Sequence, residues 1–233
     1  MEEKNILLVS DQVGVGRVAL SARIPILSTM ESKLSYLPTA VVSNNFGYGE
    51  AAVYDLTKFM EQSKDMWKKH DFQFDIIYTG IILNTEQVKI VGDIIEWQKE
   101  KPTIIVDPIM GDGGKMYPGL SLDMVEAYND MIPYADIMVP NFTELTLLLE
   151  REYPEKNDEK KVLSYLEELK NMGAKRAVVT SVNIDDKHYV YAYDKDHKVF
   201  KVEYRHIPIE MGGTGDVFSA LLIGRLNLGD SLK

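Results

Sequence analysis

Short runs of valine, isoleucine and other apolar residues alternate along the chain with longer amphipathic stretches. Most of the short runs are nearly continuous in apolar residues, which is typical of strands that are covered on both faces. The longer stretches predict helices, one of which starts with a capping box formed by Asn84 and Gln87. We expect six strands, at residues 6–9, 40–43, 75–79, 103–106, 136–139 and 177–180, and six helices, at residues 19–30, 49–69, 85–100, 122–132, 143–150 and 159–171.

The order of these elements predicts an α/β fold with three layers, α-β-α. Strands that alternate with helices form βαβ units, so we expect a mostly parallel central sheet between two helical layers, in a single domain that spans residues 1–233. The pattern changes to period two on either side of residues 194–198, which predicts an antiparallel hairpin at the edge of the sheet. A glycine-rich turn then leads into a last apolar helix at residues 216–226.

Composition and charge exclude several classes of function. The 233 residues include 26 Lys and Arg against 36 Asp and Glu, and the net charge of −10 argues against a protein that binds nucleic acid. The absence of cysteine excludes disulfides, thiolate zinc sites, iron–sulfur clusters and a cysteine nucleophile. The acidic start, MEEKNILLVSD, lacks the pattern of a signal peptide, and no apolar segment approaches the roughly 20 residues that cross a bilayer. We therefore expect a cytoplasmic protein that binds no membrane.

Ligands of parallel sheets bind beyond the carboxyl ends of the strands, so the residues that follow each expected strand are candidates for a site. A carboxylate directly after a strand, as at Asp107, suits Mg²⁺, which prefers oxygen ligands and keeps several waters. The other residues at these positions are polar or small: Ser10 and Asp11, Asn44 and Asn45, Gly80, Asn141, and Ser181.

The segment GGTGD, residues 212–216, carries the sharpest chemical signal. Small residues let successive backbone amides point into one concavity, and the helix that begins there adds the positive end of its dipole. The two together form an anion hole for a phosphoryl group, with Asp216 placed to take a proton from an attacking hydroxyl. The alternative is an ordinary glycine-rich turn in which Thr214 or Asp216 caps the helix.

Two further segments each have a structural and a functional interpretation. In VPNFTEL, residues 139–145, Asn141 and Glu144 form a capping box or bind a metal or phosphate. In VDPIMGDGGKMYPG, residues 106–119, two aspartates, four glycines and a tyrosine form either a long turn or a loop that closes over a substrate. Neither segment decides between the two interpretations by itself.

Taken in order, four segments resemble the ribokinase superfamily and, within it, the pyridoxal and pyridoxamine (vitamin B6) kinases. They are VDPIMGDGG with a following tyrosine, PNFTE, VVTS and GGTGDVFSALL. The early LPTAVVSNNFGYG and IYTG segments are also similar to B6-kinase segments, so the resemblance covers almost the whole chain. It implies a ribokinase-like fold and Mg²⁺·ATP-dependent phosphorylation of the 5′-hydroxymethyl group of pyridoxal, pyridoxamine or pyridoxine.

The resemblance also implies roles for individual residues. Asp216 matches the catalytic base of the family. The anion hole for the transferring phosphoryl group is matched by Gly213, Thr214 and Gly215. The residues that match the remaining positions are Asp107 and Glu144 for Mg²⁺, Asn141 and Glu144 for the phosphates, Asp112 and Tyr117 for the loop over ATP, and Thr180 and Ser181 for the nucleotide. The family also implies a homodimer, and it leaves open whether a monovalent cation such as K⁺ takes part.

The substrate side departs from the B6-kinase pattern. Ser10 is kept as a substrate-binding position. Asn45 and Phe46, however, stand where these kinases usually have a His-Thr pair that faces the pyridine ring. Ile81 stands where they usually have tyrosine. We expect these positions to line the substrate site and to change which alcohol it prefers.

Two other departures concern the first loop and the end of the sequence. Arg17 and Arg23 occupy positions where small or neutral residues are common. They are either substrate contacts or surface charges, and we expect both at the surface. Family chains usually continue beyond the segment that matches LNLGDSLK, so either the sequence is a piece of a longer chain or the protein is a shortened relative.

These departures leave two other functions open. The changed ring-facing positions fit a kinase for a related small alcohol, such as hydroxymethylpyrimidine. The same changes, together with the early end of the sequence, fit a degenerate relative that binds nucleotide or vitamer without turnover. Against the degenerate relative, the GGTGD segment and Asp107, Asn141 and Glu144 are all present.

Overall fold

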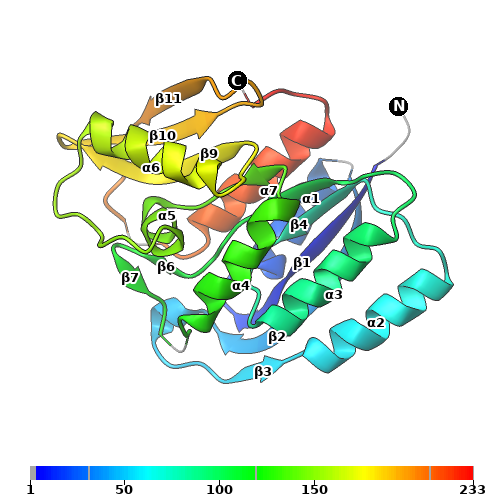
Figure 1. Ribbon diagram of the computed structural model, residues 1–233. Helices are drawn as coiled ribbons and strands as arrows, with labels where there is room; N and C mark the ends of the chain where they lie inside the picture. Colours follow the sequence, from blue (N-terminus) through cyan, green and yellow to red (C-terminus); the bar gives the residue numbers. More distant parts are fainter. Residues whose placement is uncertain (1–3, 31, 119, 210, 233) are drawn as a thin grey trace.

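Nine strands form one sheet whose centre is parallel and whose edges are antiparallel (Figure 1). The computed structural model describes residues 4–30, 32–118, 120–209 and 211–232. The strands lie in the order β11–β10–β9–β8–β5–β4–β1–β2–β3, and all neighbours from β9 to β2 are parallel. Their bounds are β1 (Asn5–Val15), β2 (Lys33–Asn44), β3 (Val53–Asp55), β4 (Ile76–Thr79), β5 (Thr103–Val106), β8 (Ile137–Met138), β9 (Ala177–Ile184), β10 (Lys187–Tyr193) and β11 (Val199–Tyr204). A separate hairpin consists of β6 (Gly111–Asp112) and β7 (Lys115–Met116).

Helices cover both faces of the large sheet (Figure 1). One face carries α1 (Leu20–Thr29) and α7 (Thr214–Asn227), which pack against each other. The other face carries α2 (Thr57–Lys69), α3 (Thr85–Glu96), α4 (Asp123–Met131), α5 (Phe142–Leu148) and α6 (Glu159–Asn171). Two single turns, η1 (Phe46–Tyr48) and η2 (Ile132–Tyr134), are 3₁₀ helices. In the described ranges no helix is both long and apolar enough to cross a bilayer.

Alternate residues of the central strands enter two different cores. In β1, Ile6 and Leu8 pack with the apolar faces of α1 and α7. Leu7 and Val9, which point the opposite way, pack with the helices of the other layer. All four side chains are fully buried. This burial on both faces explains why the strand is a continuous apolar run, and it confirms the predicted α/β sheet between two helical layers, with the hairpin of β10 and β11 at its edge.

The predicted helix at residues 49–69 is wrong in its first third. Residues 53–55 form the edge strand β3, which pairs antiparallel with β2, and the helix begins at Thr57. Asp55 Oδ1 accepts hydrogen bonds from the amide (2.6 Å) and the hydroxyl (2.5 Å) of Thr57, and these bonds mark the change from strand to helix. The helix predicted at residues 85–100 also ends early, at Glu96.

Only half of the capping box predicted at Asn84 forms. Asn84 Oδ1 accepts a hydrogen bond from the Gln87 amide (2.9 Å), as a helix cap does. The Gln87 side chain instead accepts from the amide of Leu83 (2.9 Å), and its Nε2 atom donates to the carbonyl of Thr39 in β2 (3.0 Å). Gln87 is fully buried, so the side chain that would complete the box ties α3 to the sheet.

The first two strands are much longer than predicted. β1 continues to Val15, whereas β2 already begins at Lys33 and ends at Asn44. The pair extends past the end of β4 with a register irregularity between Ser10 and Gln12. This extension has a small core of its own, in which Val13 and Val42 are buried. Polar and glycine residues interrupt the apolar run in this part of β1, which is why the pattern alone ends the strand at residue 9.

Tyr128 of α4 joins the helical layer to the turn that follows β4. Its side chain is fully buried. The hydroxyl donates to the carbonyl of Gly80 (2.8 Å) and accepts from the amide of Ile82 (3.0 Å). The turn therefore depends on one phenol for two of its backbone hydrogen bonds.

Tyr128→Phe is expected to lower the free energy of unfolding by about 1–3 kcal/mol, because two buried backbone groups lose their partner. Tyr134→Phe is the matched control, since the Tyr134 hydroxyl makes no hydrogen bond to a described residue; it should stay within about 0.5 kcal/mol of wild type. Urea unfolding followed by circular dichroism measures both. Equal losses in the two variants would contradict this account of the turn.

Candidate active site

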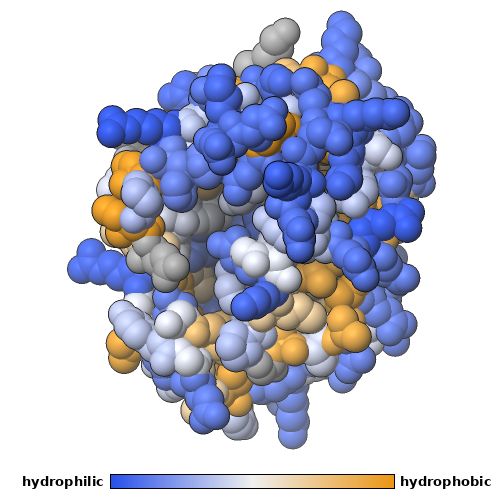
Figure 2. Space-filling model, turned by 90° about the vertical axis from the view of Figure 1, so that its left-hand side faces the viewer, coloured by the Kyte–Doolittle hydropathy of each residue, from blue (hydrophilic) through white to orange (hydrophobic). Residues whose placement is uncertain are grey.

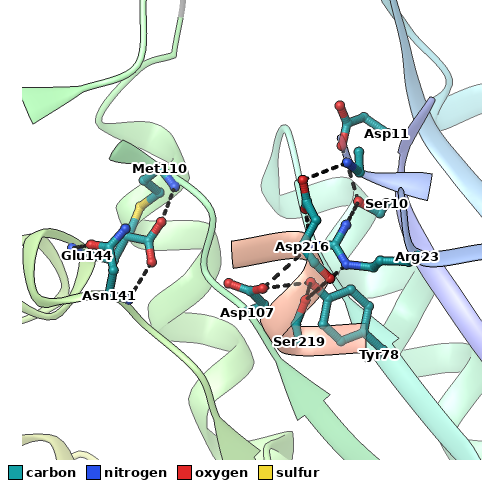
Figure 3. A network of polar contacts seen from close by, with 12 residues as sticks. Ser10, Asp11, Arg23, Tyr78, Asp107, Met110, Asn141, Glu144, Asp216 and Ser219 are labelled. Atoms are coloured by element: carbon teal, nitrogen blue, oxygen red, sulfur yellow. Dashed lines mark hydrogen bonds and ion pairs between the residues drawn. The ribbon is translucent and has the colours of Figure 1, made fainter. Parts of the chain in front are cut away.

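The polar residues of the sheet gather where the chain changes direction across it. From β1 the chain passes to β2 on one side, and β4 then lies on the other side of β1. Ligands of open α/β sheets bind at such a switch point. Ser10 and Asp11 of β1, Asp107 after β5 and Asp216 at the start of α7 lie together there (Figure 3).

Arg23 of α1 is at the centre of this group. Its side chain is fully buried, and its Nη2 atom lies 2.6 Å from Asp216 Oδ1 and 3.5 Å from Asp107 Oδ2. The prediction that Arg23 is a surface charge is therefore wrong, whereas Arg17 is exposed as predicted. A buried charge is stable only when partners lie close to it, and here two carboxylates supply them.

The remaining guanidinium atoms of Arg23 are also in contact with protein. Nε donates to Ser219 Oγ (3.1 Å) and Nη1 donates to Ser10 Oγ (3.5 Å). The guanidinium carbon lies 4.6 Å from the centre of the Tyr78 ring, within the range of a cation–π contact. The Tyr78 hydroxyl in turn donates to Asp107 Oδ2 (2.7 Å). One side chain of α1 thus connects β1, β4, the loop after β5, and α7.

Both carboxylate oxygens of Asp216 have partners from the α1 segment. Oδ1 pairs with Arg23, and Oδ2 accepts a hydrogen bond from the Ala19 amide (2.9 Å). Ala19, directly before α1, has φ 54°, a left-handed value that alanine rarely adopts. Asp216 itself lies in the first turn of α7. Its carboxylate therefore lies between the N-terminal ends of two helices, and both helix dipoles favour its negative charge.

The start of α7 leaves backbone donors free. Among the described residues, none accepts a hydrogen bond from the amide of Gly215 or of Asp216. The N-cap residue, Gly213, has φ 91°, and a Cβ atom there would lie 2.6 Å from the Arg17 carbonyl oxygen, so only glycine fits. No side chain of the described ranges caps this end, so the alternative of an ordinary turn capped by Thr214 or Asp216 is wrong.

Burial raises the pKa of two carboxyl groups beside Arg23. The pKa of Asp11 and that of Asp107 are each raised to about 6, because both side chains are removed from water. The positive charge of Arg23 opposes the shift in both cases, and the negative charge of Asp216 adds to it. Three carboxyl groups share one guanidinium, and this excess of acidic groups favours a further cation at the site.

A second polar group lies at the start of α5, apart from the Arg23 group (Figure 3). Asn141 and Glu144 form the predicted capping box. Asn141 Oδ1 accepts from the Glu144 amide (2.9 Å), and Glu144 Oε2 accepts from the Asn141 amide (2.8 Å). Glu144 Oε1 also accepts from the Met110 amide (3.2 Å), and Asn141 Nδ2 donates to the Gly111 carbonyl (2.8 Å). Both side chains therefore hold the loop that follows β5 as well as the helix.

Asp107 fits a Mg²⁺ site better than Glu144 does. Both Glu144 oxygens already accept backbone hydrogen bonds, and burial, with the charge of Asp107, raises the pKa of Glu144 well above its ordinary value. Asp107 Oδ1 has no hydrogen-bond partner among the described residues. Within the same residues, no three His, Asp or Glu side chains form a cage for a metal. Mg²⁺ at nucleotide sites takes one or two carboxylates and fills its shell with phosphates and waters, so one free oxygen is compatible with it.

The predicted loop over ATP is the β6–β7 hairpin and the residues after it. The Gly114 amide donates to Thr143 Oγ1 of α5 (2.9 Å), which holds the hairpin to the second polar group. Asp112 is exposed, and Tyr117 is half-buried. Burial raises the pKa of the Tyr117 hydroxyl, and the charges of Glu144 and Asp112 add to the shift. Glu144, a member of the second polar group, is thus close enough for its charge to act on the Tyr117 hydroxyl.

Thr180 and Ser181 lie in β9, close to the start of α5. Thr180 pairs with Asn141 in an isolated parallel bridge, and its amide donates to the Pro140 carbonyl (3.0 Å). Ser181 has φ 57° and is half-buried near Tyr204 of β11. Of the two residues, Thr180 is the one that the structure places beside Asn141.

The four residues predicted for the substrate side lie in different environments. Asn45 caps η1, with its Oδ1 accepting from the Gly47 amide (3.0 Å), and its Nδ2 lies so near Gly212 that a Cβ there would be 2.2 Å away. Phe46 is partly buried against two cores. Ser10 is fully buried, and Ile81, with 5% of its surface exposed, belongs to the main core. Asn45 is therefore adjacent to the turn before α7.

Sequence reasoning missed Arg23, Tyr78 and Ser219 as members of this group. For Arg23 a signal was present: it lies three residues after Leu20 and four before Leu27, both of which are buried. Residues with this spacing share one face of a helix, so a charge among them indicates a buried ion with partners. Tyr78 and Ser219 carry no such signal, because buried tyrosine in a strand and small serine in an apolar helix are ordinary.

Comparison with known proteins identifies a family model and similar solved structures. The family model described as phosphomethylpyrimidine kinase matches residues 31–233. A Bacteroides thetaiotaomicron protein, provisionally named a phosphomethylpyrimidine kinase and crystallised with pyridoxal, is 38% identical, with a TM-score of 0.93 and coverage of 99% of this chain and 82% of that one. Pyridoxal kinase from Lactobacillus plantarum is 30% identical, with a TM-score of 0.87 and coverage of 98% and 82%. Plasmodium falciparum PdxK, with ligands AMP-PNP and PL, is 25% identical, with a TM-score of 0.80 and coverage of 97% and 82%.

Asp11→Asn is expected to stabilise the protein above about pH 6. The pKa of Asp11 is raised from 3.8 to about 6, so between these values the folded state holds a proton that the unfolded chain has released. Wild type therefore loses stability as pH rises through this window, and the variant does not. The difference should grow from near zero at about pH 4 to on the order of 3 kcal/mol above about pH 6.

Urea unfolding of both proteins across this pH range measures the difference. Asp185→Asn, at an exposed turn, is the matched control for the replacement of a carboxylate by an amide. A stability difference for Asp11→Asn that is the same at every pH would contradict the raised pKa.

Proposed function

Because the chain belongs to the phosphomethylpyrimidine kinase family, its chemistry is that of a kinase, and we propose that it transfers the γ-phosphoryl group of ATP to a B6 vitamer. The acceptor is the 5′-hydroxymethyl group of pyridoxal, pyridoxamine or pyridoxine. One observation carries the proposal: the Asp216 carboxylate lies beside a helix start whose Gly215 and Asp216 amides have no acceptor among the described residues. A base next to free backbone donors is what phosphoryl transfer to an alcohol requires.

In the proposed reaction Asp216 takes the proton of the substrate hydroxyl as its oxygen attacks the γ-phosphorus. The bond to the β-phosphate oxygen breaks, and ADP leaves with the electron pair of that bond. The amides at the start of α7 donate to the oxygens of the transferring group, where negative charge has to be stabilised. Asp216 accepts two contacts from the α1 segment, but a carboxylate has about four lone-pair sites, so sites remain for the substrate hydroxyl.

Asp107 is the residue proposed to hold Mg²⁺, through its free Oδ1 atom or through a water. When bound, Mg²⁺ neutralises phosphate charge and orients the phosphates for in-line transfer. We propose that Asn141 and Glu144 act by holding the loop after β5 in place. This assignment gives Glu144 a supporting role instead of the role in binding Mg²⁺ and the phosphates that the family resemblance implies.

The proposed nucleotide site lies on the α5 side. Thr180 adjoins Asn141, and the hairpin that carries Asp112 leads into Tyr117 next to the same helix. We propose that these residues, with Ser181, contact the nucleotide. The Plasmodium falciparum protein, which contains AMP-PNP together with PL, supports ATP as the phosphoryl donor.

The Bacteroides thetaiotaomicron relative, which contains pyridoxal, supports a vitamer as the acceptor. A second candidate, phosphorylation of a hydroxymethylpyrimidine, is favoured by the residues on the substrate side. Asn45 and Phe46 replace the His-Thr pair of B6 kinases, and Ile81 replaces a tyrosine that could stack on a ring. A hydroxymethylpyrimidine carries the same kind of hydroxymethyl group on a six-membered ring with one more nitrogen, so the same base and anion hole would serve it.

A one-pot competition assay separates the two candidates. Pyridoxal, pyridoxamine, pyridoxine and hydroxymethylpyrimidine are incubated together with Mg²⁺·ATP, and mass spectrometry follows each phosphorylated product. We expect phosphorylated B6 vitamers to form first. Preferential phosphorylation of the pyrimidine would replace the proposed substrate, and ATP binding without any product would refute both candidates.

Asp216→Asn is expected to lower kcat by about 10²- to 10⁴-fold, the usual contribution of a general base. ATP affinity, measured by calorimetry, should be retained, because the amide is nearly the same size as the carboxylate. Asp185→Asn, in the exposed turn between β9 and β10, is the control and should keep full activity. Undiminished turnover in Asp216→Asn would remove this residue as the base.

A further inference from the structure

Arg23 is a buried cation that has no role in the reaction proposed above. It comes from α1, a helix that carries none of the proposed catalytic or nucleotide-binding residues. Its side chain has no exposed surface, and each of its three nitrogens contacts a protein group. Because the side chain is fully buried, a ligand cannot reach its N–H groups. Its function must therefore be exerted on the protein groups that it contacts.

The shortest of these contacts is to Asp216. Nη2 lies 2.6 Å from Oδ1, whereas its distance to Asp107 Oδ2 is 3.5 Å. The guanidinium is itself fixed by Ser219 on Nε, by Ser10 on Nη1 and by the Tyr78 ring against its face. A planar group held at its two other nitrogens and on one face cannot rotate, so its Nη2 atom presents a fixed point to Asp216.

The second oxygen of Asp216 is fixed from the same segment. Ala19 is four residues before Arg23, and its amide donates to Oδ2 at 2.9 Å. With one contact on each oxygen, the plane of the carboxylate and the direction of its free lone pairs are both determined. The direction of the lone pairs decides whether a base meets the substrate hydroxyl in line with the phosphoryl group.

We propose that Arg23 is a positioning residue for phosphoryl transfer, which holds the Asp216 carboxylate in the orientation that accepts the substrate proton. This inference rests on the function proposed above, because it concerns the same base. It adds to that function a residue on a different helix, α1.

Two variants test the proposal by kinetics. Arg23→Ala removes the guanidinium, and kcat should fall about 100-fold while KM for Mg²⁺·ATP stays the same, because the orientation of the base is lost and nucleotide binding is not. Arg23→Lys keeps the charge but cannot reach Ser219, Ser10 and Asp216 together, so its kcat should lie between those of Arg23→Ala and wild type. Arg225→Ala, which removes an exposed arginine from α7, is the control and should have wild-type kinetics.

Chemical rescue distinguishes positioning from a purely structural role. Guanidinium at about 20 mM, far below the molar concentrations that unfold proteins, should restore much of the lost kcat of Arg23→Ala by occupying the vacated space. Urea has the same shape without the charge, so at equal concentration it should restore nothing. Wild-type kcat in Arg23→Ala, or a loss that both compounds relieve equally or that neither relieves, would overturn the proposal. If Arg23→Ala does not fold, wild-type kcat in Arg23→Lys overturns it.

Hydrogen exchange at the Ala19 amide gives a readout that needs no turnover. This amide donates to Asp216 Oδ2, so NMR should find it protected in wild type and faster to exchange in Arg23→Lys and Arg23→Ala. The amide of Ile77, in the buried strand β4, is the internal reference and should not change. Unchanged exchange at Ala19 in the folded variants would overturn the proposal even if no substrate is found. Absence of turnover in wild type, with faster Ala19 exchange in the variants, would refute the proposed function and leave Arg23 as the residue that orients Asp216.

Discussion

The ion pairs of a fully buried arginine constrain how the layers of this protein meet. Arg23 lies between the sheet and the α1–α7 layer, where an unpaired charge would cost several kcal/mol. The surrounding elements therefore each supply a group that accepts from it or faces it: β1, β4, the loop after β5, and α7. Because these elements are far apart in the sequence, satisfying one guanidinium also places them relative to one another. The polar residues proposed for catalysis are the same groups that satisfy this charge.

The polar residues of the site form two groups. On one side Asp216 and Asp107 are fixed by Arg23, close to the free amides of α7. On the other side Asn141 and Glu144 are fixed by the backbone of α5 and by the loop that they hold. In the proposed reaction the first part handles the proton and the transferring group, and the second shapes the nucleotide side. Asp107 belongs to the first part, and its charge raises the pKa of Glu144 in the second. A metal held by Asp107 with phosphate ligands would therefore connect the two parts.

The sequence predicted the parts of the fold whose burial pattern is simple. Strands buried on both faces and amphipathic helices follow directly from spacing, and the glycine-rich start of α7 from composition. The extension of β1 and β2 and the edge strand β3 were not predictable, because these segments depend on pairing with each other and contain glycine and polar residues. The environment of Arg23 was missed for a different reason. A charge in a helix is usually exposed, and only its spacing from Leu20 and Leu27 indicates otherwise.

Asn45, on the proposed substrate side, lies next to the turn that leads into α7. Asn45 Nδ2 occupies the space where any residue but glycine at position 212 would place its Cβ, 2.2 Å away. A change at Asn45 is therefore felt by the turn that forms the proposed anion hole, and not only by the ring of the substrate. Ile81 differs in kind, because it is packed in the core and its carbonyl accepts from the Thr39 hydroxyl (2.7 Å). In the proposed function, the departure at Asn45 would therefore bear on both substrate choice and phosphoryl transfer, whereas the departure at Ile81 would act through packing.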